Sequence, residues 1–143
     1  MALVNKTRIS TTPSSSKQLF YRDFLSNLNT SYDSDDLIFV ENDDAVKSAL
    51  RNLIFTAPGE RPYNNDFGCN LKYMLFEPIT PQTEQAILTT IKNTISSYEP
   101  RIKLIDVVVS GAIDDNAYNV TITYATINTK EPEVIDFILR RVR

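Results

Sequence analysis

The sequence contains no histidine and no tryptophan, and it has a single cysteine, Cys69. Without histidine the chain cannot form a Ser-His-Asp or Cys-His nucleophile system, and it offers no imidazole ligand to a metal. One cysteine excludes an intrachain disulfide and a zinc site built from clustered cysteines. We therefore expect no cofactor and no metal centre, and we interpret Cys69 as a small buried apolar residue.

Long apolar runs are also missing. No segment approaches the ~20 apolar residues that span a bilayer, and the N-terminus lacks the apolar stretch of a secretory signal. We expect a soluble protein of a reducing compartment, without a membrane partner. The formal net charge of −3 and the pI near 4.9 argue against nucleic acid as a partner, because duplex-binding domains usually carry a concentrated positive face.

The remaining composition is that of a globular protein. The 143 residues are 42% hydrophobic and 23% charged, which suits a single domain with one core. Residues 1–18 are polar and rich in serine and threonine, and we interpret them as an N-terminal arm that is flexible in the isolated protein. It is either a disordered tail or a segment that becomes ordered when it binds a partner. Residues 19–143 then form the domain. Its first part holds an irregular aromatic segment at 19–28, an acidic turn at 33–36 and a short strand at 37–40.

Two helices are predicted from the spacing of apolar residues. Asn42 or Asp43 can cap the first, which must end before Pro58. Thr80 caps the second, with Pro81 at its first position, and Pro100 ends it. The expected core faces are Val46, Ala49, Leu50, Leu53 and Ile54 in the first helix, and Ile87, Leu88, Ile91, Ile95 and Tyr98 in the second.

After Pro100 the period of the apolar residues changes from 3.6 to 2, which indicates strands. A first strand places Ile105, Val107 and Val109 on one face, and a turn at 114–116 leads to a second strand. That second strand buries Tyr118, Val120, Ile122 and Tyr124. The segment 133–142 suits a helix or a strand, and its β-branched and aromatic content favours a strand. The predicted fold class is α+β: a small antiparallel sheet with helices packed on one face and an extended N-terminal arm.

Three blocks of sequence carry a family resemblance. They are Pro58-Gly59-Glu60-Arg61-Pro62, then Phe67-Gly68 with Leu71, and finally Glu99-Pro100-Arg101 at the helix–strand junction. Their order and spacing resemble the baseplate wedge protein of contractile-tailed phages that initiates the tail sheath, and in outline its type VI secretion counterpart. The resemblance implies a non-enzymatic virion component, assembled in the host cytoplasm in six copies per baseplate. Its implied partners are inner wedge proteins and the tail sheath protein.

The first candidate partner-binding surface is the helix–strand junction. We interpret Glu99, Pro100 and Arg101, together with Glu60 and Arg61 of the long loop, as a docking site for a neighbouring subunit. The charges beside Pro100 can point away from the core. The alternative is that they pair inside the domain, for example Arg101 with Glu60 or Glu77.

The second candidate surface is the C-terminal strand, with Ile135, Phe137, Arg140 and Arg141 as its partner-binding residues. An open strand edge is a template for another chain, and the resemblance implies that this sheet accepts extended arms of sheath subunits. In the predicted register Ile135, Phe137 and Leu139 face the helices. The arginines at 140, 141 and 143 form either a solvated tip or a positive end that steers an acidic arm.

Proteins that resemble this chain have been labelled lysozymes, so a peptidoglycan hydrolase with paired carboxylates is the alternative function. Such an enzyme needs two carboxylates ~5–9.5 Å apart, one of them with a raised pKa. The candidates are Glu60, Asp66, Glu77 and Glu99. The chain is one small domain without tryptophan, and the neighbouring arginines and prolines favour pairing over burial. We therefore expect a protein without enzymatic activity. A regulatory or adaptor domain that only shares the fold is a third possibility.

Overall fold

A computed structural model describes residues 20–24, 37–128 and 130–141. The predicted arm and the acidic turn at 33–36 lie outside these residues. In chain order the elements are β1 (Arg22–Phe24), β2 (Phe39–Glu41), α1 (Asp43–Phe55), the 3-10 turn η1 (Met74–Phe76), α2 (Pro81–Tyr98), β3 (Ile102–Ala112), β4 (Ala117–Thr126) and β5 (Pro132–Arg140). No helix among them is long and apolar enough to cross a membrane.

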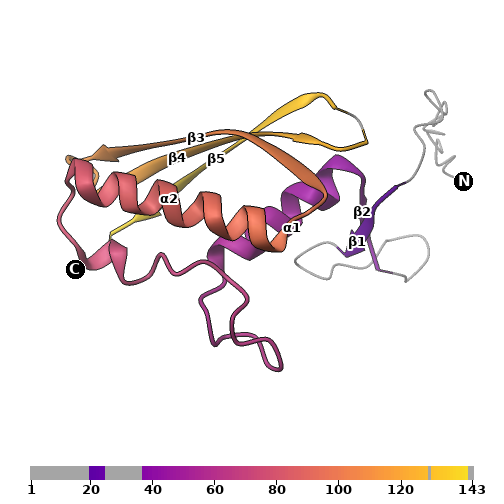
Figure 1. Cartoon of the computed structure of the whole chain (residues 1–143), viewed down its shortest axis with the longest axis horizontal. Coiled ribbons are helices and arrows are strands. Elements are labelled where there is room, and N and C mark those ends of the chain that lie inside the picture. Colours follow the sequence, from indigo (N-terminus) through magenta and orange to yellow (C-terminus); the bar gives the residue numbers. More distant parts are fainter. Residues whose placement is uncertain (1–19, 25–36, 129, 142–143) are drawn as a thin grey trace, which may run out of the picture.

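The main sheet is antiparallel, with the strand order β3-β4-β5. Both helices lie on the same side of this sheet, and α2 runs along β3 (Figure 1). A separate two-stranded ribbon of β1 and β2 lies near the start of α1. The α+β prediction is confirmed.

The ends of the two helices differ in how they are fixed. Thr80 caps α2 as predicted, because its Oγ1 accepts a hydrogen bond from the Thr83 N–H at 3.2 Å. Asn42 precedes α1 but makes no side-chain cap. Its Oδ1 accepts instead from the N–H groups of Phe20 and Tyr21, at 2.8 and 3.4 Å. The Asn42 side chain therefore ties the start of the described chain to α1.

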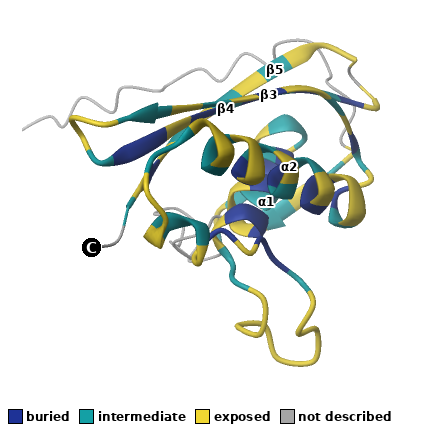
Figure 2. Cartoon of the chain, turned by 60° about the vertical axis from the view of Figure 1, so that its left-hand side comes forward, coloured by how far each residue is buried: buried dark blue, intermediate teal, exposed yellow. Residues whose placement is uncertain are grey.

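The core lies between the sheet and the two helices, and Figure 2 shows it as the dark blue segments of α1, α2 and β4. The four predicted residues of β4 are fully buried. In the helices, Ala49, Leu88 and Tyr98 are only half-buried. The buried cluster is Val46, Leu50, Ile54, Cys69, Leu71, Ile87, Ile91, Ile95, Ile102, Val107, Tyr118, Val120, Ile122, Tyr124 and Leu139.

The prediction for Ile105 is wrong. The β3–β4 register shifts between Leu104 and Asp106, and Ile105 is 54% exposed, whereas Val107 is buried. A β-bulge inserts one extra residue into a strand, so the inward and outward alternation is interrupted there. The period of the apolar residues alone could not reveal this interruption.

The C-terminal segment is a strand, as favoured from its composition. β5 pairs with β4 along its whole length without a register shift, and it lies at one edge of the sheet. Ile135 and Phe137 pack against the core, Leu139 belongs to it, and Ile138 on the opposite face is 61% exposed. The predicted register of β5 is therefore confirmed.

Candidate functional site

The loop between α1 and η1 projects from the body of the domain (Figure 1), and hydrogen bonds fix its base. The Cys69 N–H donates to the Thr56 carbonyl at 2.8 Å, and the Gly59 N–H donates to the Asn65 carbonyl at 2.8 Å. Gly68 has a φ of 123°, and a Cβ there would collide with the Thr56 carbonyl oxygen. Only glycine satisfies both conditions. The base of the loop between α1 and η1 therefore has a fixed conformation.

Glu99 and Arg101 pair with each other across Pro100. Both carboxylate oxygens of Glu99 accept, from Nε and Nη2 of Arg101, each at 2.6 Å. Glu99 is 6% exposed, so the expectation that both charges point away from the core is wrong for Glu99. The partner of Arg101 is also not Glu60 or Glu77. Because the chain turns at Pro100, residues 99 and 101 reach the same side. The hydrogen bond to Glu99 raises the pKa of the Arg101 guanidinium.

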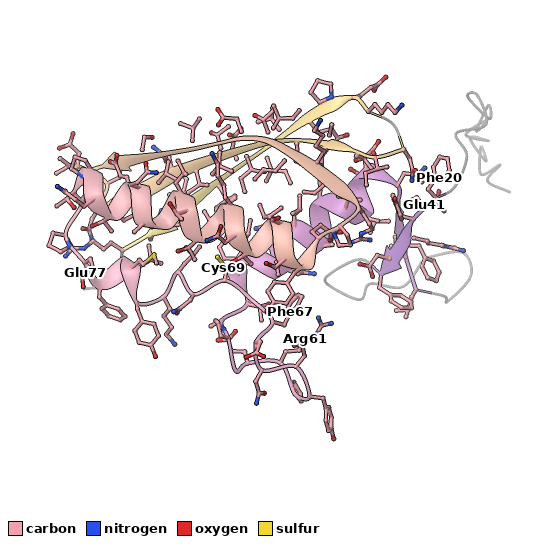
Figure 3. All side chains as sticks on the ribbon, in the orientation of Figure 1. Phe20, Glu41, Arg61, Phe67, Cys69 and Glu77 are labelled. Atoms are coloured by element: carbon pink, nitrogen blue, oxygen red, sulfur yellow. The ribbon has the colours of Figure 1, made fainter. Side chains whose placement is uncertain are left out.

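A cleft of about 600 Å³ adjoins this pair. It brings together four of the predicted partner-binding residues from two distant parts of the chain. The Arg61 guanidinium lies over the Phe67 ring, 4.4 Å from its centroid, and Phe67 packs edge-on against Tyr98. Figure 3 shows Arg61 and Phe67 on the projecting loop. The cleft is lined by Asp23, Ala49, Asn52, Leu53, Thr56, Glu60, Arg61, Pro62, Phe67, Tyr98, Glu99 and Arg101.

Two of the four candidate carboxylates of a glycoside hydrolase bond within the domain. Glu99 is occupied by Arg101, and Oε2 of Glu60 accepts the Ala57 N–H at 2.9 Å. Glu77 lies at the other end of the domain from Arg61 and the cleft (Figure 3). In the described ranges, no three acidic or cysteine side chains gather as metal ligands would.

Cys69 is buried, as predicted, at 2% exposure. Burial raises the pKa of its thiol above the ordinary value, and the hydrogen bond from Thr94 only partly opposes that shift. A thiol of this kind is a poor nucleophile because little of it is thiolate at neutral pH. Cys69 is therefore part of the packing.

One hydrogen bond at the end of β5 determines which residues of this strand direct their backbone N–H and C=O groups towards β4. The Arg141 N–H donates to the Asn116 carbonyl at 3.0 Å, and antiparallel pairs alternate between bonded and non-bonded positions. Leu139 and the alternate residues before it therefore bond to β4. The backbone groups of the intervening residues point away from β4, and they define what we call the free edge of β5. These residues are Val134, Asp136, Ile138 and Arg140. Within the described residues, no side chain accepts their N–H groups.

The β3 edge of the sheet is different. The same alternation turns the backbone groups of Val107, Val109 and Gly111 away from β4. The Val107 N–H donates to Oδ1 of Asp106, and the Gly111 N–H donates to Oε1 of Glu84, both at 2.8 Å. Two of these three donors are thus occupied. Sequence analysis missed Asp106 and Glu84, because their role depends on the bulge and on the docking of α2.

The two arginines at the end of β5 have different environments. Arg140 is exposed. Arg141 folds back, with Nη1 donating to Oδ1 of Asn116 at 3.3 Å and Nη2 to the Phe76 carbonyl at 3.4 Å. Arg141 is therefore not part of a solvated tip, because it bonds within its own domain, whereas its role in partner binding stays a prediction. Arg143 lies outside the described residues.

Comparisons with known proteins identify the family to which this chain belongs. The family model described as baseplate wedge protein gp25 matches residues 40–131. The chain belongs to this family. Baseplate wedge protein gp25 of Enterobacteria phage T4 is 34% identical to the chain over 87 residues, which are 61% of this chain and 66% of that protein, slightly less than two thirds of its length.

Solved structures agree on the fold. A protein of Geobacter sulfurreducens with the provisional name tail lysozyme has a TM-score of 0.65 and 25% identity, covering 70% of this chain and 91% of its own. A chain in the anti-feeding prophage baseplate has a TM-score of 0.62 and 21% identity, covering 86% and 87%. A chain of the type VI secretion baseplate complex has a TM-score of 0.58 and 17% identity, covering 68% and 91%. The predicted likeness to phage and type VI baseplate proteins is confirmed.

Proposed function

We propose that the chain is a structural, non-enzymatic wedge protein with two binding surfaces. The cleft docks it to inner wedge proteins, and the free edge of β5 initiates the tail sheath by accepting an extended strand. The observation that carries this proposal is the difference between the two edges of the sheet. Hydrogen bonds within the domain occupy most of the turned-out donors of β3, whereas no described residue occupies those of β5. Backbone pairing at such an edge supplies affinity.

The cleft is suited to docking because it presents fixed charges beside aromatic walls. Arg101 uses two of its five N–H donors on Glu99, and its side chain remains 32% exposed. Arg61 is exposed and is held over Phe67. Arginine and aromatic side chains are enriched at the energetic centres of interfaces.

Arg61→Glu tests this docking site. The substitution should leave the melting temperature close to wild type, because Arg61 is exposed and makes no ion pair among the described residues. Incorporation into baseplates, measured by purification of assembled particles, should fall at least tenfold. Arg51→Glu on the exposed part of α1 is the matched control and should incorporate normally. Normal incorporation of Arg61→Glu would contradict docking through the cleft.

Arg101→Ala is a less specific probe of docking. It would leave the Glu99 carboxylate buried without its partner. Removing one member of a fully buried ion pair lowers the free energy of unfolding by ~3–5 kcal/mol. The loss is smaller here because Arg101 is partly exposed. We therefore expect this variant to melt at a lower temperature and to incorporate poorly for that reason.

We infer the absence of enzymatic activity from Glu60 and Glu99, whose carboxylates bond within the domain. In a muralytic assay, the purified wild-type protein should show no lysis activity, and glutamine replacements of Glu60, Glu77 and Glu99 should give the same result. Hydrolysis of peptidoglycan that one of these replacements abolishes would favour the lysozyme function instead.

The proposed copy number is based on the symmetry of a related particle. We propose six copies per baseplate, assembled in the host cytoplasm before the sheath is added. A structural relative lies in a baseplate that was described with six-fold symmetry. Counting chains in purified baseplates by quantitative mass spectrometry, relative to another wedge protein, tests this number.

A further inference from the structure

A groove of about 320 Å³ lies beside the C-terminal part of β5. Its walls come from the end of α1, the projecting loop and η1. Figure 3 labels Cys69, which forms part of this wall. Residues of both faces of β5 line the groove, which places it at the edge of the strand. Its lining residues are Ile54, Phe55, Ala57, Glu60, Cys69, Leu71, Lys72, Leu75, Ile138, Leu139 and Arg140.

A strand added to β5 would project side chains into this groove at defined positions. Strands in a sheet lie ≈ 4.7–4.9 Å apart, and directly opposite residues share a face. Leu139 points towards the helices, so the added residue opposite Leu139 points the same way, over the apolar wall. The added residue opposite Arg140 points to the outer face, beside an exposed guanidinium.

The charge at the rim of the groove is positive. Lys72 and Arg140 are exposed, and neither has an ion-pair partner in the part of the chain that the structure describes. Glu60 is the one acidic residue in the lining, and its Oε2 already accepts a backbone N–H. An acidic side chain of a partner would therefore be attracted to this rim.

We propose that the free edge of β5 recognises an extended segment in which a bulky apolar residue and an acidic residue are neighbours. The apolar residue fills the groove opposite Leu139. The acidic residue pairs with Arg140, and Lys72, which also lines the groove, adds to the positive charge there. This inference rests on the proposed strand addition and adds the side-chain specificity of the partner.

Two labelled synthetic peptides of nine residues, the length of β5, provide the probe. Both alternate threonine with leucine or valine, and they differ at one position beside the central leucine, which is glutamate in one and lysine in the other. Fluorescence polarisation with the full chain should show that the glutamate peptide binds about fivefold tighter, as a favourable cross-strand charge pair implies. Replacing the central leucine by serine should weaken binding at least tenfold.

Charge reversal in the protein gives the specific readout. Lys72→Glu combined with Arg140→Glu should invert the preference, so that the lysine peptide binds better. Lys103→Glu combined with Lys130→Glu changes the net charge equally near the β3 side and should preserve the wild-type preference. An unchanged preference in the first variant, equal binding of both peptides, or no binding of either peptide would overturn the inference. Strand addition itself is judged separately, from sheath assembly on Ile138→Pro baseplates.

Discussion

Both edge strands of the main sheet direct backbone N–H groups away from β4, but the two strands differ in whether other groups of the domain accept those N–H groups. β3 has a bulge, and carboxylates of Asp106 and Glu84 accept two of its turned-out N–H groups. β5 has no bulge, and Ile138 near its C-terminal end is exposed. Bulges and covering elements are the usual means by which proteins prevent edge-to-edge association. Their presence on the β3 edge, and their absence from the β5 edge among the described residues, is the reason why we propose β5 as the edge used for assembly.

The largest expected effect comes from Ile138→Pro. Proline removes the N–H that Ile138 turns to the free edge, and it leaves the bonds of Leu139 to β4 in place. Baseplates that carry Ile138→Pro should recruit no sheath, although the isolated variant keeps its circular dichroism spectrum. The measurement is sheath polymerisation on purified baseplates, observed by electron microscopy.

Val109→Pro is the control at the opposite edge. It removes the corresponding N–H of β3 and should leave sheath recruitment intact in baseplates. If Ile138→Pro reduces the native spectrum, Val134→Pro gives a second test at an exposed residue of β5. Normal sheath on folded Ile138→Pro or Val134→Pro baseplates would show that β5 is not the template.

A smaller effect is expected from Gly111→Ala, which tests how closely α2 covers the β3 edge. A Cβ at residue 111 would collide with the Ile79 side chain and lie 2.8 Å from Oε1 of Glu84. Overpacking of this kind costs roughly 1–3 kcal/mol. Thermal unfolding should show this loss of stability, whereas Ser110→Ala, next to it on the exposed face, should be nearly neutral. An unchanged melting temperature for Gly111→Ala would mean that α2 does not pack closely on the β3 edge at this residue.

The smallest expected effect is alkaline destabilisation of the β4–β5 contact. Tyr124 donates to Oε2 of Glu133 at 2.9 Å, and burial is the main cause that raises the pKa of its phenol. Above pH ~10 the unfolded tyrosine loses its proton while the folded one keeps it, so stability falls as the pH rises, by at most ~1.4 kcal/mol per unit for one group. Melting between pH 9 and 11 measures this slope. Tyr124→Phe should melt with a shallower slope, and an equal slope would exclude Tyr124 as its source.

Much of the fold could be predicted because its signals are local. The period of the apolar residues fixed α2, β4 and the register of β5, and Thr80 and Pro81 marked where α2 begins. The bulge at Ile105 could not be predicted, since both registers bury some apolar residues of β3. The sequence showed the three blocks that carry the family resemblance, but the meeting of Arg61 with Arg101 in one cleft depends on the tertiary fold.

The sequence did not predict the orientation of two charged side chains, Glu99 and Arg141. The residues around Pro100 were expected to point outward, and Glu99 is buried because Arg101 compensates its charge. Arg141 was grouped with Arg140 by adjacency, yet neighbouring residues of a strand face opposite ways, and Arg141 reaches back to Asn116. Asp106 and Glu84 were missed for the same reason, since their carboxylates act on backbone groups distant from any motif.

Hydrogen exchange of the β5 amides tests the central claim most directly. In the isolated chain, the amides of Val134, Asp136, Ile138 and Arg140 should exchange rapidly, and those of Ile135, Phe137 and Leu139 should be protected by β4. In baseplates that carry sheath, the first set should become protected as well, while the amide of Val109 on β3 should exchange as before. Rapid exchange of the first set in the assembled tail, or new protection at Val109 instead, would contradict strand addition at β5.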